Sequence, residues 1–193
     1  MKKVWIALLG IFVIFACFKI ERVHSSIADS VIRLHILANS DSVYDQEQKL
    51  KVRDFVLEKY GKKLSADTRE EALEKIYSQL PQMLKDIKAV SGQEVKISVK
   101  ESFFPTKDYG NFSFPTGKYL ALKIELGKGE GKNWWCVMYP PLCFREFTAV
   151  SDLGELKKVL SPEEYELVTK GNKKVLYKFK AVEVWNSIKQ VFN

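Results

Sequence analysis

The sequence predicts an α+β domain in which a small, mainly antiparallel sheet packs against helices. Alternating apolar and polar residues mark four strands, at 31–38, 95–100, 119–126 and 134–139. Two helical patterns separate the first strand from the second, and the other strands then follow one another. That order is typical of a sheet with helices on one of its faces. The 193 residues of the chain are enough for one domain with a sizeable core.

The first residues predict export. Lys2 and Lys3 precede an apolar run over 4–18, which further charged residues end. A positive start and an apolar core of this length are typical of a secretory signal sequence. The run is shorter than the ~20 residues that a membrane-spanning helix needs. The two lysines favour an orientation with the N-terminus inside and the domain outside.

We therefore divide the chain into a signal sequence or short membrane anchor over 1–25 and a single exported α+β domain over 26–193. Three fates of the first part remain open. It is cleaved, it is retained as an anchor that associates with the membrane, or it is lipidated at Cys17.

The first strand leads directly into the first helix. Arg33 and His35 alternate with apolar residues within 31–38, so both lie on the face opposite the apolar one. A polar turn follows, and Ser42 stands three residues before Asp45, which approximates a capping box. The helix is expected over 43–60, and the glycine that follows should end it.

The next helix is expected to start at Asp67 and Thr68, and Pro81 should break or kink it. An aromatic loop is expected over 103–116. The glycine-rich turn at 127–132 separates two predicted strands and favours an antiparallel hairpin between them.

The C-terminal part returns to helix. Ser151 and Ser161 mark two helix starts, the second with proline at the first helical position. A turn at 171–172, a short strand at 175–180 and a closing helix at 181–192 complete the prediction.

The charge of the chain is modestly positive, at +7, and lysines are interleaved with acidic residues along most of the sequence. This pattern is typical of a solvated basic surface. Attraction to anionic lipid or to a cell-wall polymer remains open. No basic cluster coincides with a nucleic-acid-binding motif, so we expect no nucleic acid partner.

Two cysteines of the domain, Cys136 and Cys143, flank a stiff Pro-Pro pair. Outside the reducing cytosol such a pair can form a disulfide, which we predict here. Two buried thiols, or half of a metal site, are the alternatives. A zinc site needs about four ligands and the chain has only two histidines, so no metal is predicted.

Catalytic signals are weak. His35 and Asp41 could act as an acid–base pair, but a histidine that bonds a neighbouring turn is the commoner case. The sequence carries no nucleophile elbow, and the glycine run at 127–132 lacks the helix that follows a phosphate loop. We therefore predict no enzyme and no cofactor.

Trp134 and Trp135 are adjacent on a strand, so their rings point to opposite faces of the sheet. An outward ring beside a rigid turn would suit a protein-binding anchor. The alternative is that both rings pack under the aromatic loop.

Two sequence blocks resemble the stage II sporulation protein R family. Residues 33–54 read RLHILANSDSVYDQEQKLKVRD, and the family's block is R-L-H-I-L-A-N-S-D-S-x-x-D-Q-x-x-K-x-x-V-R-D. About a hundred residues later, 133–144 read NWWCVMYPPLCF, preceded by PTGKY at 115–119. The blocks occur in the family's order, and the resemblance spans roughly 32–192.

The resemblance implies a role in endospore formation. Members of this family are made in the forespore and exported into the space between the forespore and mother-cell membranes. There they activate a membrane-bound aspartic protease of the mother cell, stage II sporulation protein GA, which processes the sigma-E precursor. The rival expectation is an exported enzyme or binding protein that acts on cell wall.

The resemblance assigns no contact residues. We expect partner contacts around the strand–helix turn and at the Pro-Pro loop, namely at His35, Asn39, Asp41, Lys49, Arg53, Trp134, Trp135, Pro140 and Pro141.

Overall fold

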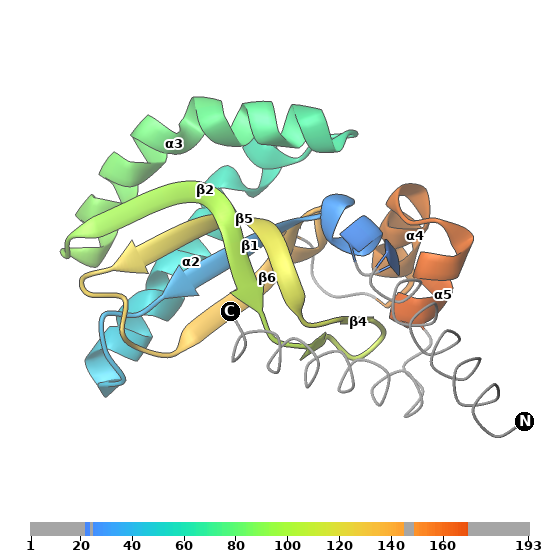
Figure 1. The fold of residues 1–193 in the computed structure, drawn as a ribbon. Coiled ribbons are helices and arrows are strands. Elements are labelled where there is room, and N and C mark those ends of the chain that lie inside the picture. Colours follow the sequence, from blue (N-terminus) through green and yellow to red (C-terminus); the bar gives the residue numbers. More distant parts are fainter. Residues whose placement is uncertain (1–21, 24, 145–148, 170–193) are drawn as a thin grey trace, which may run out of the picture.

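The computed structural model describes residues 22–23, 25–144 and 149–169. It confirms an α+β fold with a mainly antiparallel sheet (Figure 1). In chain order the elements are β1 (Ile32–Leu37), α2 (Val43–Leu64), α3 (Arg69–Ser91), β2 (Val95–Phe104), β3 (Lys107–Asp108), β4 (Ser113–Phe114), β5 (Gly117–Leu126), β6 (Asn133–Tyr139), the 3-10 turn η1 (Leu142–Phe144), α4 (Ala149–Val159) and α5 (Pro162–Thr169).

The predicted hairpin between the third and fourth strands is wrong. The strand order in the main sheet is β2-β5-β1-β6, so β1 lies between β5 and β6. It pairs with β5 in parallel and with β6 in antiparallel fashion, and β2 pairs with β5 in antiparallel fashion. The glycine-rich segment 127–132 crosses the end of β1 instead of reversing tightly. Its backbone N–H groups at Gly131 and Glu130 donate to the carbonyl oxygens of Ala38 and Asn39, at 2.9 and 3.2 Å.

Helices α2 and α3 cover one face of the sheet (Figure 1). The apolar side chains of β1 and β5 on that face are fully buried under them. Burial of apolar surface stabilises a fold by roughly 25 cal/mol per Å² removed from water. We therefore expect this cluster to be the main source of stability. It includes Ile32, Leu34, Ile36, Val52, Val56, Tyr60, Ile76, Ile87, Leu122 and Ile124.

A second core lies on the opposite face, so the expectation of helices on one face is incomplete. The aromatic segment that was expected to be a loop contains the small β3–β4 hairpin. Its phenylalanines pack with α4 and α5, which stand beside the end of the sheet where β1 begins (Figure 1). This cluster includes Phe104, Phe112, Phe114, Tyr119, Val137, Leu156 and Val168.

The start of α2 agrees with the local sequence signal, and its end does not. Ser42 caps α2 as predicted, accepting a hydrogen bond from the backbone N–H of Asp45 at 3.1 Å. The predicted end at Gly61 is wrong, since α2 continues to Leu64, whose side chain is buried in the core. Burying a leucine is worth about 1.5–3 kcal/mol, which outweighs the ~1 kcal/mol cost of an interior glycine.

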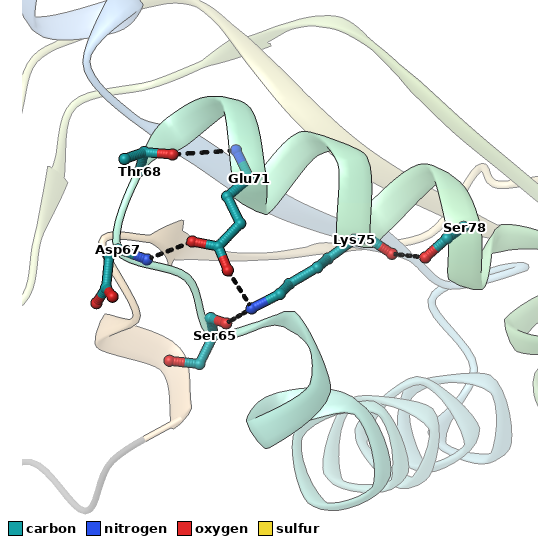
Figure 2. Close-up of polar contacts among 6 residues, drawn as sticks. All are labelled: Ser65, Asp67, Thr68, Glu71, Lys75 and Ser78. Atoms are coloured by element: carbon teal, nitrogen blue, oxygen red, sulfur yellow. Dashed lines mark hydrogen bonds and ion pairs between the residues drawn. The ribbon is translucent and has the colours of Figure 1, made fainter.

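The junction between α2 and α3 is held by a polar network (Figure 2). Thr68 caps α3 by accepting from the backbone N–H of Glu71 at 3.2 Å. Lys75 forms an ion pair with Glu71 at 2.7 Å and donates to the backbone carbonyl of Ser65 at 2.6 Å. Helix α3 then runs without interruption through Pro81.

Some predictions fall outside the described residues. These are residues 1–21 and 24 of the signal or anchor segment predicted over 1–25, the turn at 171–172, the strand at 175–180 and the helix at 181–192. Within the described part of the chain, no helix is long and apolar enough to cross a membrane.

Candidate functional site

The turn between β1 and α2 is organised around the carboxylate of Asp45. Its Oδ2 atom accepts from Ser40 Oγ at 2.6 Å and from Asn39 Nδ2 at 2.9 Å, and its Oδ1 atom accepts from Gln93 Nε2 at 3.1 Å. These hydrogen bonds, the one from Ser40 first, lower the pKa of the Asp45 carboxyl. Gln93 follows α3, so the carboxylate joins the start of one helix to the end of the other.

The same turn is locked to the segment 127–132. Asn39 Oδ1 accepts from the backbone N–H of Lys128 at 2.9 Å, and Asp41 Oδ1 accepts from that of Lys132 at 2.7 Å. The predicted contact residues Asn39 and Asp41 therefore already have internal partners. Their role in partner binding stays a prediction, and the structure gives both a part in holding β5 and β6 beside β1.

Lys49 is only 5% exposed. Its Nζ atom donates to Gln46 Oε1 at 2.6 Å and to the carbonyl oxygen of Lys132 at 3.1 Å. Burial lowers the pKa of the ammonium group, which the nearby Asp41 carboxylate partly offsets. This lysine therefore has internal partners in the turn, and its role in partner binding stays a prediction.

We expect stability to depend on the charge of Asp45. The pKa of this carboxyl is lower in the folded chain than in the unfolded one, so its contribution is complete above the unfolded value of about 4 and is lost as the pH falls through the folded value. Urea unfolding of the wild type and of Asp45→Asn from neutral to acid pH measures this. The wild type should be clearly more stable at neutral pH, and the difference should shrink steadily toward acid. A constant difference would contradict the role of the charge.

His35 lies on the other sheet face, away from the turn. Its Nε2 atom is 2.7 Å from Asn133 Oδ1, and its ring stacks on Trp135 with 5.9 Å between centroids. Burial lowers its pKa, and its Nδ1 atom is buried with no hydrogen-bond partner among the described residues. Asp41 accepts from the backbone N–H of Lys132 while His35 bonds Asn133, and in the described structure no hydrogen bond joins the two residues of the supposed acid–base pair. The described residues contain no group of three potential metal ligands either.

Arg33 is the residue whose role sequence reasoning missed. Its side chain is fully buried, and its guanidinium carbon lies 4.4 Å from the centroid of Phe104, with Phe114 and Tyr119 at 5.2 and 5.0 Å. Its Nε atom donates to the Cys136 carbonyl at 2.9 Å and Nη2 donates to Tyr109 Oη at 2.7 Å. No carboxylate among the described residues pairs with it, and burial lowers its pKa. Two sequence features could have indicated this role, namely a single charged residue in an otherwise mostly apolar strand and an aromatic-rich segment elsewhere in the chain.

The two tryptophans do point to opposite faces. Trp134 packs against the core under the helices, where Arg53 lies over its ring at 5.6 Å. Trp135 packs in the second core, and Lys107 lies over its ring at 5.0 Å. Both rings are half-buried, so neither is a free anchor, and partner contact by Trp134, Trp135 and Arg53 stays a prediction.

The Pro-Pro loop is buried. Pro140 follows a cis peptide bond, and both prolines lie inside the domain. Cys136 and Cys143 form a disulfide with 5.9 Å between their Cα atoms, as the sequence predicted. The loop therefore closes the end of β6 against the domain, and its use as a partner contact stays a prediction.

Loss of this disulfide should destabilise the domain by about 2 kcal/mol, because a short ring removes only limited freedom from the unfolded chain. Urea unfolding of the double variant Cys136→Ala with Cys143→Ala measures the loss. Reductant should lower the stability of the wild type similarly and leave the variant unchanged. Equal stability of oxidised and reduced wild type would show that the bond contributes nothing.

Comparison with known proteins identifies the family of the chain. The family model described as stage II sporulation protein R matches residues 28–149, which spans β1 to the start of α4. Stage II sporulation protein R of Bacillus subtilis (strain 168) is 41% identical over 160 residues, covering 78% of this chain and 67% of that protein. No solved structure matches the chain. Since the family model covers more than half of the chain, and this relative is similar over most of it, the chain belongs to the stage II sporulation protein R family.

Proposed function

We propose that this protein is an exported signalling protein of endospore formation. It acts in the space between the forespore and mother-cell membranes. There it activates a membrane-bound aspartic protease, stage II sporulation protein GA, which processes the sigma-E precursor. Membership of the stage II sporulation protein R family is the observation that carries this proposal.

The proposed mechanism is binding and not catalysis. Two features support it: His35 and Asp41 have separate partners, and the family's first block is largely used to lock the turn after β1. A rigid domain can activate a receptor by binding its active form more tightly than its inactive form. To raise the active form from about 1% to about half of the receptor, roughly a hundredfold preference suffices.

Co-expression in a non-sporulating host tests this function. The full chain, the protease and the sigma-E precursor are produced together and in each pairwise combination. We expect the precursor to shorten only when all three are present. Failure to shorten, with the chain shown to be exported and folded, would sink the proposal.

His35→Gln separates signalling from catalysis in the same assay. Glutamine can keep a hydrogen bond to Asn133 but cannot act as a general acid or base near neutral pH. A signalling protein should retain most of its effect on the precursor. Loss of the effect in a folded His35→Gln protein would show that the imidazole itself is needed, either as an acid or base or as the predicted partner contact.

A further inference from the structure

The outward face of α2 carries three large apolar side chains that are exposed. Val43, Tyr44 and Leu50 are 75%, 60% and 38% exposed, and they are three of the five large apolar side chains that stand out as exposed in the described structure. The opposite side of the helix fills the core, so this face cannot turn inward. We call it the α2 outer face, made up of Val43, Tyr44, Glu47, Leu50, Asp54 and Glu58.

Helix geometry gathers these residues together. At about 100° per residue, Val43, Glu47, Leu50, Asp54 and Glu58 fall in a sector roughly 80° wide, with Tyr44 beside it. All six side chains are exposed.

A shallow hollow of about 580 Å³ follows this face toward α3. Leu50, Phe55 and Val90 supply its apolar lining. An apolar stripe beside a hollow between two helices can accept the apolar side of an amphipathic helix.

The charge of the face decides what can bind there. The hollow is lined by three acidic side chains, Glu47, Asp54 and Glu58, and by one basic side chain, Lys51. The face is therefore locally negative, although the overall charge of the chain is +7. Asp54 pairs with Arg53 at 2.7 Å but its side chain stays 63% exposed. An anionic membrane surface or a nucleic acid would be repelled by this face, and a second copy of the chain would present the same carboxylates to it.

We propose that the α2 outer face is a docking surface for a cationic amphipathic helix of a partner protein. Apolar side chains of that helix lie against Val43, Tyr44 and Leu50, and its lysines or arginines face Glu47 and Glu58. This inference rests on the proposed function, which identifies the partner as the membrane-bound protease. It adds the place on the domain where that partner binds. The predicted contacts Asn39, Asp41 and Lys49 would then position the face by locking the start of α2, without touching the partner.

Two exposed tyrosines provide a matched test in the three-component assay. A photo-crosslinking phenylalanine analogue replaces Tyr44 in one full-length chain and Tyr77, which lies on α3 and is 54% exposed, in another. The chain labelled at Tyr44 should crosslink to the protease and the chain labelled at Tyr77 should not. Precursor shortening by the wild type with no crosslink from Tyr44 would overturn the docking surface and leave the function standing.

Charge reversal gives a second measurement. Glu47→Lys with Glu58→Lys should weaken partner binding about tenfold, since two favourable pairs become repulsive. The control, Glu74→Lys with Glu101→Lys, changes the net charge equally at exposed sites outside α2. Equal loss in both variants would attribute the effect to overall charge and overturn the proposal.

A model peptide separates the surface from the function. A labelled helical peptide of leucine and lysine, and its leucine and glutamate counterpart, are titrated onto the full chain in nanodiscs of zwitterionic lipid. The positive overall charge of the chain favours binding of the acidic peptide. Tighter binding of the lysine peptide can therefore come only from the α2 outer face, and Glu47→Lys with Glu58→Lys should abolish it. Preference for the acidic peptide would overturn the docking surface even if precursor processing were observed.

Discussion

Arg33→Ala should destabilise the domain by about 3–5 kcal/mol, the largest loss expected for any single substitution here. The change leaves a cavity among Phe104, Phe114 and Tyr119, and it strips the Cys136 carbonyl and the Tyr109 hydroxyl of their donor. Urea unfolding followed by tryptophan fluorescence gives the free energy of unfolding.

Arg33→Met distinguishes packing from charge. Methionine fills much of the same space without a charge. The guanidinium bears a desolvation cost that no carboxylate among the described residues offsets. We expect a loss of no more than about 2 kcal/mol, clearly less than for alanine. If methionine were as damaging as alanine, the hydrogen bonds of the guanidinium and not its bulk would hold the second core together.

Gly131→Ala should cost about 3 kcal/mol, because the added methyl group has no room. A Cβ atom at this position would stand 2.2 Å from the carbonyl oxygen of Ser40 and 2.9 Å from the side chain of Ala38. The first contact is with backbone, so relief requires movement of the turn itself. That movement would break the hydrogen bond from Gly131 to Ala38.

Gly154→Ala is the matched control. This glycine lies in α4, and a Cβ atom there would have nothing within 4 Å. Alanine should be neutral or stabilise by up to about 1 kcal/mol, since it favours helix more than glycine does. Thermal unfolding of both variants compares them directly. Similar effects of the two substitutions would contradict the close approach of the crossing segment to the turn.

The strands and helices were predictable because their signals are local. Alternation marked β1 and β5 within one or two residues of their ends, and the serine before α2 acts as its cap. The boundary at Gly61 failed because burial of Leu64, a tertiary effect, outweighs the local preference of glycine. The hairpin failed for a related reason: a glycine-rich turn shows that the chain changes direction, but not how many strands it crosses.

The candidate site was predictable only as a location. The sequence marked the turn after β1 as informative, and that turn is where Asn39, Asp41 and Lys49 converge. Each also bonds a backbone group of 127–132, which lies 83 to 91 residues away, so no local pattern could show that they face inward. The burial of Arg33 was hidden in the same way, because its aromatic neighbours come from distant segments.

The central place of β1 has a consequence for how the chain folds. Both of its neighbours lie far along the sequence, as the pairing of Arg33 with Ala121 on one side and Val137 on the other shows. The first strand of the sheet to be synthesised must therefore wait for β5 before it gains one neighbour and for β6 before it gains the other. Contacts of such long range make folding slow, and they leave an apolar strand open to wrong pairing in the meantime. Cutting the chain anywhere before β6 would thus leave β1 without its second neighbour. The sheet can be completed only after β6 has been synthesised.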